Sequence, residues 1–278
     1  MDFYKAENYK GIRFFHTVEE HPVPDDFSRH CHEHYEIIYV KRGSGKYVVE
    51  GVCYDLRAET MMLFRPGDFH YVNVEHSEAY ERYVLHFSTD ELLATSDTVK
   101  ALLEKPLFEG VFYETGSFSL SVTPVFEHFS RLSQLPQQLS EQMAPLLLSE
   151  LLHLLSVASP TSHKSHREEP LGARVIRYVN AHMAEPQSLD ALASEFYVSK
   201  FYLCRAFKQH NGISILGYIN GKRVMMARQM LESGEAASVV SERVGFSDYS
   251  TFYRAYRKAY GHAPTAVRRT REKREVRS

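Results

Sequence analysis

The feature that most constrains the fold of this chain is a repeat in its C-terminal part. The segments VSKFYLCRAFKQHNG (198–212) and SDYSTFYRAYRKAYG (247–261) align with a shift of 49 positions, which places Arg205 over Arg254. In both copies the apolar residues recur at the three- and four-residue spacing of a helix. A shorter helical segment precedes each copy, SLDALASEF before the first and AASVVSERVGF before the second. A short helix, a tight turn and a second helix with a cationic outer side form a helix-turn-helix, so the repeat predicts two such units.

Helical spacing divides the side chains of each copy between a buried and an outer side. The predicted buried sides are Leu203, Ala206, Phe207 and His210 in the first copy, and Phe252, Ala255, Tyr256 and Ala259 in the second. The predicted outer sides are Phe201, Cys204, Arg205 and Lys208 in the first copy, and Ser250, Tyr253, Arg254 and Arg257 in the second, with Tyr249 exposed in its first turn. Ser188 and Ser199 are expected helix N-caps, and Ser247 or Asp248 should cap the second copy. A helix of about 19 residues, roughly 28 Å long, is expected between the copies.

The outer sides have the chemistry of a DNA-reading surface. The major groove of B-DNA admits one helix, and arginine matches the paired acceptors of guanine. Two helices about 34 Å apart would enter successive major grooves on one face of the duplex. We expect Arg205 and Arg254 to read bases, and we expect six other residues mostly to neutralise phosphate: Lys200, Lys208, Arg257, Lys258, Arg268 and Arg269. Because the outer residues of the copies differ, the DNA site should be an asymmetric sequence about two helical turns long.

Charge is distributed unequally along the chain. The formal net charge of the 278 residues is only -2, yet from Leu171 to the end there are 18 Lys and Arg against 9 Asp and Glu, whereas residues 1–170 have 15 against 26. A basic part joined to an acidic part indicates that the basic part meets a polyanion. The alternative is a merely solvated surface with incidental arginines. The recurrence of arginine in two equivalent helices argues against that alternative.

Composition favours a soluble cytoplasmic protein without membrane association. Cys31, Cys53 and Cys204 include no C-x-x-C pair, which disfavours a disulfide framework or a structural zinc site and fits a reducing compartment. The N-terminal MDFYKAENYK lacks the apolar region of a signal peptide. The most apolar run, PLLLSELLHLLSVA, is interrupted by Glu150 and His153 and is too short to span a bilayer.

The N-terminal part changes its apolar period partway. Short runs rich in β-branched and aromatic residues (YEIIYV, GKYVVEG, TMMLFRP and YERYVLHF) alternate with turn residues, as in a sandwich or barrel. From 119 to 158 the period is helical, and the second helix there is apolar on more than one side, so it should pack on the β-structure or pair with its copy in a homodimer. The polar segment 159–170 is interpreted as a linker. The expected domains are 1–158, with a barrel over about 12–90 and helices over about 119–158, and 171–278.

The segment RHCHEHYEIIYVKRGSG carries the candidate effector site. If the segment is one strand, alternation places a row of polar and then apolar side chains on one face: His30, His32, His34, Glu36, Ile38 and Val40. A polar row that continues into apolar positions indicates the wall of a pocket rather than a solvated edge. His70, which follows the turn in RPGDFH, could approach this row from a second strand.

The C-terminal part resembles the DNA-binding domain of AraC/XylS-type transcription regulators over about residues 172–270. The first copy matches through LDALASEFYVSKFYLCRAFKQHNGISILGYINGKRVMMARQML, and the second carries the family signature as VGFSDYSTFYRAYRKAYGHAP. The resemblance implies seven helices, two helix-turn-helix units and a rigid linking helix. It also implies that eight positions face DNA: Phe201, Cys204, Arg205, Tyr249, Ser250, Thr251, Tyr253 and Arg254. The chain departs from the family pattern at Ser241, Ala263 and Val267, which touches packing more than DNA reading.

The N-terminal part resembles the small cupin barrel that precedes this domain in many such regulators. The cupin metal pattern H-x-H-x3-E-x6-G is met by His30, His32, Glu36 and Gly43, with His70 as a fourth ligand, and such donors suit a first-row divalent metal. Three interpretations stay open: a metal-free small-molecule pocket, strand-packing histidines, and a metal site. We expect the first, without metal or other cofactor, and the resemblance implies a sugar or a related small molecule as the effector.

The sequence thus predicts a two-domain α+β protein, with an all-β cupin-like barrel and dimerisation helices followed by an all-α domain whose two helix-turn-helix units are joined by a long helix. We expect a sequence-specific transcription regulator, not an enzyme, that binds double-stranded DNA as a homodimer and contacts RNA polymerase if it is an activator. The alternatives are a cupin-type metal-dependent enzyme fused to a basic module, and a constitutive regulator whose barrel only dimerises.

Overall fold

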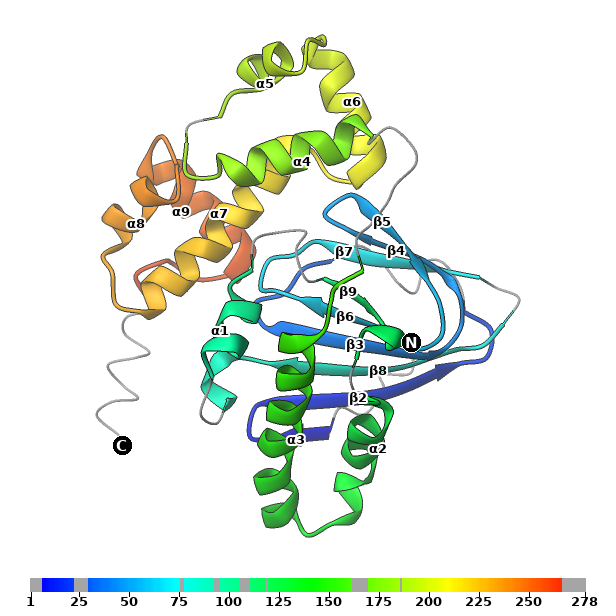
Figure 1. The fold of residues 1–278 in the computed structure, drawn as a ribbon. Coiled ribbons are helices and arrows are strands. Elements are labelled where there is room, and N and C mark those ends of the chain that lie inside the picture. Colours follow the sequence, from blue (N-terminus) through cyan, green and yellow to red (C-terminus); the bar gives the residue numbers. More distant parts are fainter. Residues whose placement is uncertain are drawn as a thin grey trace. The chain divides into compact units, whose positions relative to one another are not determined.

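The chain divides into two compact units. The computed structural model describes residues 7–22, 30–75, 78–92, 96–105, 111–118, 120–161, 170–185 and 187–266. The units are Met1–Lys164 and Ser165–Ser278 (Figure 1). Residues 162–169 of the predicted linker, as well as Val267, Arg268 and Arg269, lie outside the described residues. No helix in the described ranges is both long and apolar enough to cross a membrane.

Two antiparallel sheets build the first unit. The six-stranded sheet has the order β1-β2-β8-β3-β6-β9 and the three-stranded sheet the order β5-β4-β7. The strands of the larger sheet are β1 (Glu7–Tyr9), β2 (Ile12–Glu19), β3 (Tyr35–Arg42), β6 (Thr60–Phe64), β8 (Tyr80–Phe87) and β9 (Phe112–Glu114). Those of the smaller sheet are β4 (Gly45–Val49), β5 (Val52–Leu56) and β7 (His70–Val74). The four runs predicted to be strands are confirmed as β3, β4, β6 and β8.

Apolar side chains from both sheets meet in one buried cluster. Strand alternation directs Ile38 and Val40 of β3 into this interior, where they meet Tyr47 of β4, Tyr54 of β5 and Phe64 of β6. The ring centroids of Tyr47 and Phe64 lie 5.4 Å apart. Packing between the sheets, rather than any single strand, therefore closes the β-structure.

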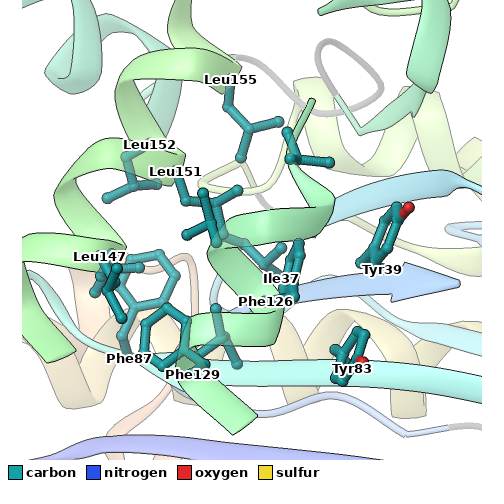
Figure 2. Close-up of a cluster of buried hydrophobic side chains, with 14 of the residues drawn as sticks. Ile37, Tyr39, Tyr83, Phe87, Phe126, Phe129, Leu147, Leu151, Leu152 and Leu155 are labelled. Atoms are coloured by element: carbon teal, nitrogen blue, oxygen red, sulfur yellow. The ribbon is translucent and has the colours of Figure 1, made fainter. Parts of the chain in front are cut away.

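Three helices cover the outer face of the larger sheet: α1 (Asp97–Leu103), α2 (Thr123–Arg131) and α3 (Gln137–Val157). Figure 2 shows leucines of α3 and aromatic rings of α2 directed at β3 and β8. The Phe126 ring is stacked on Tyr39 with centroids 4.9 Å apart, and the hydroxyls of Tyr39 and Thr123 are hydrogen-bonded at 2.8 Å. Because both faces of β3 are covered, its sequence reads as a continuous apolar run rather than an alternating one.

Several short elements of the first unit have no counterpart in the sequence prediction. These are strands β1 and β9, helix α1, and three 3-10 turns: η2 (Thr89–Glu91), η3 (Thr115–Ser117) and η4 (Leu132–Gln134). Strand β9 has three residues and pairs with β6 across about fifty positions of sequence. Strands this short carry almost no periodic signal, so they become visible only when the sheet offers them a partner.

The second unit is helical throughout its described residues. Its helices are α4 (Leu171–Ala181), α5 (Leu189–Glu195), α6 (Lys200–Asn211), α7 (Ile215–Glu232), α8 (Ala237–Arg243) and α9 (Tyr249–Tyr260). The resemblance implies seven helices, and residues 170–185 and 187–266 contain these six. Helix α7 has 18 residues, close to the predicted 19, which gives about 27 Å at 1.5 Å per residue.

The repeat of the sequence is a repeat of structure. The Ser199 hydroxyl accepts a hydrogen bond from the Tyr202 N–H at the start of α6, and the Asp248 carboxylate accepts one from the Thr251 N–H at the start of α9. Both helices end on a glycine in the left-handed conformation, at residues 212 and 261. The N-cap of the second copy is therefore Asp248 and not Ser247.

One buried position of the second copy was predicted wrongly. Ala259 is exposed, although its helical spacing from Phe252 places it on the inner side. The buried cluster that α9 shares with α7 and α8 includes Phe252 and Tyr256, whereas Tyr260 is only partly buried against it. In the last turn of α9, α7 covers Tyr260, whose ring lies 4.6 Å from the Arg228 guanidinium, and leaves Ala259 exposed. Ser241, a departure from the family pattern, is buried and donates its hydroxyl hydrogen to the Ser238 carbonyl of the same helix.

Two glycines of the second unit allow a matched test of backbone crowding. Gly245 has φ +89°, and a β-carbon there would lie 2.8 Å from the Ala184 carbonyl oxygen and 2.8 Å from Arg223 Nη2. Gly261 has φ +75° but nothing within 4 Å of a β-carbon. Both alanine variants carry the cost of a positive φ, so we expect Gly245→Ala to be the less stable by about 1–3 kcal/mol. Urea denaturation of both variants measures the difference, and equal midpoints would contradict the crowding at Gly245.

Candidate DNA interface and histidine cluster

The outer side of α6 is exposed where the sequence placed it. Phe201, Arg205 and Lys208 are exposed and Cys204 is half-buried, whereas Leu203 and Phe207 are fully buried. Lys200 is exposed and its ammonium group lies 2.9 Å from the Asp190 carboxylate of α5. Helix α6 therefore presents a phenyl ring and a guanidinium group one turn apart on its most exposed line.

Helix α9 presents a more polar outer side. Ser250, Arg254, Arg257 and Lys258 are exposed, and Tyr249 is 41% exposed. Arg254 Nη2 donates to the Thr251 hydroxyl at 3.3 Å, and this hydroxyl donates to the Asp248 carboxylate at 2.8 Å. The Thr251 backbone N–H, and next its hydroxyl, hold the pKa of Asp248 below its usual value, so the carboxylate is ionised. The N-cap thus also orients Arg254 at the surface. Tyr253 and Thr251 are half-buried beside it.

The histidine segment is not one continuous strand, which corrects the sequence prediction. Strand β3 begins at Tyr35, so strand alternation does not apply to His30, His32 and His34. His30 instead forms an isolated antiparallel bridge with His70, with backbone N–O distances of 3.1 and 3.0 Å. This bridge brings the segment to the end of β7 in the other sheet. The predicted residues therefore do converge, but through a loop rather than along a strand face.

A buried carboxylate lies at the centre of the histidines. Glu36 is 5% exposed, and its Oε2 lies 3.0 Å from Nε2 of His32 and 3.0 Å from Nε2 of His70. Its Oε1 accepts a hydrogen bond from His86 Nε2 at 2.8 Å. Burial by itself would raise the pKa of Glu36, but the hydrogen bonds from His32, His70 and His86 outweigh burial and hold this pKa well below its usual value.

The imidazoles differ in charge. Burial alone would lower the pKa of His70, but the hydrogen bond and the charge of Glu36 outweigh burial and raise this pKa, which favours the imidazolium form beside Glu36. Burial lowers the pKa of His86 despite the opposing effect of Glu36. Burial and the neighbouring His32, His86 and Arg13 lower the pKa of His34 to about 3. His34 and His86 are therefore neutral near pH 7 and offer ring nitrogens as acceptors.

His86 is the member of the cluster that the sequence reasoning missed. It lies in YERYVLHF, where it pairs across strands with Glu36 in the β3–β8 register. Its Nδ1 is buried and, among the described residues, has no hydrogen-bond partner. The only sequence signal was a histidine between the apolar residues Leu85 and Phe87, and its proximity to Glu36 depends on a strand pairing across about fifty residues.

The imidazole nitrogens and the carboxylate of this cluster are ligand types that suit a divalent metal ion. The ligand atoms of His30, His32, Glu36 and His70 all lie within 4.8 Å of one another. The Nδ1 atoms of His32 and His70 donate to the backbone carbonyls of His34 and Asp68, each at 2.8 Å, which directs both Nε2 atoms at Glu36. Metal-ligating histidines commonly have such support at the other ring nitrogen. A second group, His32, His34 and His86, is equally close.

These two sites define a class of protein. A β-domain with a buried polar cluster precedes a domain that has two helix-turn-helix units, an arrangement expected of a DNA-binding regulator with its own ligand-binding domain. Comparison with known families agrees for both domains: residues 17–156 match the AraC-like ligand binding domain and residues 192–270 match a helix-turn-helix domain. The chain belongs to the AraC family of transcription regulators.

Some relatives match nearly the whole chain and others only its helix-turn-helix part. The HTH-type transcriptional activator RhaS of Escherichia coli O139:H28 (strain E24377A / ETEC) is 28% identical over 280 residues, which covers 98% of this chain and 96% of RhaS. The structure of unsaturated fatty acid-bound wild-type ToxT from Vibrio cholerae strain SCE256 is 14% identical, covers 93% of this chain and 95% of that chain, and has a TM-score of 0.36. The C-terminal domain of AraT, a response regulator from Geobacillus stearothermophilus, is 32% identical, covers 37% of this chain and 88% of that domain, and has a TM-score of 0.35.

Proposed function

We propose that this regulator reads a specific DNA sequence through α6 and α9. The observation that carries the proposal is the equivalence of the two helices, each N-capped by a side chain, C-capped by glycine and provided with an exposed arginine at the same position, Arg205 or Arg254. The eleven residues proposed to contact DNA are Lys200, Phe201, Cys204, Arg205, Lys208, Tyr249, Ser250, Thr251, Tyr253, Arg254 and Arg257. Selection of binding sites from random duplex DNA with the full-length protein tests the proposal, and an enriched motif is the expected result.

The charged residues divide into two roles. Arg205 and Arg254 would read base edges, because a guanidinium matches guanine bidentately. Lys208, Arg257 and Lys258, at later turns of the same helices, would neutralise phosphate. Lys200 would exchange its exposed pairing with Asp190 for a phosphate, at little cost since exposed ion pairs contribute little.

Salt should weaken the DNA complex steeply. Each neutralised phosphate releases condensed counterions, so the logarithm of the binding constant should fall linearly with the logarithm of salt concentration, by about 0.9 per phosphate contact. Fluorescence anisotropy titrations at several salt concentrations measure this slope. Removing Lys208 or Arg257 should reduce the slope by about 1 each. A flat response to salt would contradict the phosphate assignment.

We further propose that the histidine cluster binds the small-molecule effector. His30 is exposed, His32 and His34 are half-buried, and Glu36 and His70 are buried, so the cluster leads from the surface into the interior of the β-domain. The buried Nδ1 of His86 is an acceptor ready for a ligand hydroxyl. Neutral imidazoles and a carboxylate suit the hydroxyls of a sugar, the effector class that the family resemblance implies. Effector binding would shift the equilibrium between arrangements of the protein, provided that the ligand prefers one of them.

A sugar effector should stabilise the folded protein. A ligand that binds only the native state adds about 2.7 kcal/mol at a concentration of one hundred times its dissociation constant. A thermal-shift screen of the full-length chain against a panel of sugars should therefore give at least one clear increase in Tm. The increase should disappear in His86→Phe, which removes the free acceptor. If no compound raises Tm, the dimerising barrel becomes the better interpretation.

A second candidate function follows from the metal-compatible donor set. His30, His32, Glu36 and His70 would hold a first-row divalent ion, which would supply Lewis-acid or redox chemistry in a cupin-type enzyme. Elemental analysis of the purified protein separates the candidates. Stoichiometric iron, nickel or manganese would favour the enzyme, whereas we expect a regulator without catalytic activity, in keeping with its relatives.

The remaining partners are a second copy of the chain and RNA polymerase. Leu139, Leu146 and Val157 lie on α3 and are 42, 58 and 68% exposed, which supports the prediction that this helix pairs with its copy. Contact with RNA polymerase would follow if the protein activates transcription. Analytical ultracentrifugation with and without Leu146→Glu tests the dimer.

A further inference from the structure

The two recognition helices differ in chemistry at the position one turn before the arginine. On α6 this position is Phe201, which is 76% exposed, and on α9 it is Ser250, which is exposed as well. Phe201 and Arg205 are four residues apart, as are Ser250 and Arg254, so each pair lies on one line along its helix. The equivalent surface positions of the two helices thus carry a phenyl ring on α6 and a hydroxyl group on α9.

The phenyl ring belongs to an exposed aromatic patch around the start of α6, formed by Tyr197, Phe201 and Tyr202. These side chains are 96, 76 and 56% exposed. Tyr197, in the turn between α5 and α6, has φ 55°, a left-handed conformation that a β-carbon disfavours. In the equivalent turn between α8 and α9, the left-handed residue is Gly245. A tyrosine so exposed gains little from packing in the free protein. Three exposed aromatic rings within six residues are therefore better explained by a contact made outside this chain.

The chemistry of the major groove offers Phe201 one partner. A phenyl ring can neither donate to nor accept from a base edge, and the apolar feature of the groove is the C5-methyl group of thymine. Contact with a methyl group removes apolar surface of both groups from water, so it favours thymine over bases without that methyl. The α9 surface has instead a polar row in which Asp248 and Thr251 orient Arg254.

We infer that α6 recognises thymine through apolar contact between Phe201 and the C5-methyl group, while α9 reads its half of the site by hydrogen bonds. This inference rests on the proposed DNA-binding role of the two helices. Arg205, one turn further along α6, fixes the position of the phenyl ring by its own contact with a neighbouring base. Recognition at the two half-sites is then different in kind as well as in sequence.

Uracil tests the inference, because it differs from thymine only by the methyl group. A site is first selected from random duplex DNA with the full-length protein, and each thymine is then replaced by deoxyuridine in turn. For the wild-type protein we expect about fourfold weaker binding at one or two positions of one half-site, the effect of about one buried methyl group. With Phe201→Ser, which gives α6 the residue of α9, thymine and uracil should bind equally at those positions.

Two controls make the outcome specific. Val239→Ser removes another exposed apolar side chain, 49% exposed on α8, and should leave the uracil effect unchanged. Ser250→Ala alters the other half-site and should also leave it unchanged. If a specific site is selected but uracil has no effect, or the effect persists in Phe201→Ser, the methyl contact is overturned and the aromatic patch is better assigned to a protein partner. If no specific site is selected, the proposed DNA-reading role fails, and this inference fails with it.

Discussion

Arg254→Ala is expected to weaken binding to the selected DNA site by about 1–3 kcal/mol, or roughly 5- to 150-fold in the dissociation constant. The guanidinium is exposed at the surface of α9 and is oriented there by the Thr251 hydroxyl, which Asp248 in turn holds. Such preorientation lowers the entropic cost of a bidentate contact with guanine. Besides lower affinity, the variant should tolerate any base at one position of the site. Competition titrations with single-base variants of the site measure both effects.

Arg257→Ala is the matched control for charge. It lies on the same helix one turn later and is proposed to contact phosphate, so its loss should weaken specific and random DNA by the same factor. The two variants remove the same charge, and only Arg254→Ala should change the order of preference among bases. Equal losses of Arg254→Ala on specific and random DNA would show that this arginine does not read a base.

Glu36→Gln is expected to destabilise the β-domain by about 3–5 kcal/mol, because it removes the central charge of a buried network. The carboxylate contacts three imidazoles at 2.8–3.0 Å, and its pairing with His70 keeps that histidine charged in a fully buried position. The neutral amide of glutamine cannot balance the charge of a buried imidazolium. In addition, its amino group would face ring N–H groups that in the wild type donate to a carboxylate oxygen. Urea denaturation followed by circular dichroism measures the change.

Glu81→Gln is the matched control for burial. Glu81 also contacts a histidine and a cation, with His16 Nε2 at 2.9 Å and Lys41 Nζ at 3.3 Å, but the side chains of these two partners are 37% and 40% exposed. Ion pairs of this kind contribute about 0–1 kcal/mol, so this variant should unfold close to the wild type. If Glu36→Gln were as stable as Glu81→Gln, Glu36 would not be the ionised centre of the cluster, and its role in holding an effector would also be in doubt.

The helical unit could be predicted almost entirely from the sequence. The caps at Ser188 and Ser199 and the exposed arginines were expected from residues within four or five positions of one another. Failures occurred where the outcome depended on a distant partner. Ala259 was expected to be buried, but in the last turn of α9 the residues of α7 cover Tyr260 instead.

In the β-domain, by contrast, much of the candidate site could not be predicted from the sequence. Four runs were predicted correctly as strands, but β2 was not among them, and three of the histidines precede β3 rather than forming part of it. The candidate effector-site residues His30 and His70 meet through a bridge between backbone segments forty positions apart, and His86 joins Glu36 through the register of β3 and β8. A shift of one residue in that register would turn His86 to the opposite face.

The sequence by itself thus determined the family, the two helix-turn-helix units and the candidate DNA-reading residues. Helix periodicity, capping and turn residues act within a few positions, so they can be read along the chain. Only the tertiary structure decided which histidines surround Glu36, that His86 is among them, and that short strands such as β9 complete the sheet. These features depend on pairings between distant strands, whose energy comes from packing that no local stretch of sequence contains.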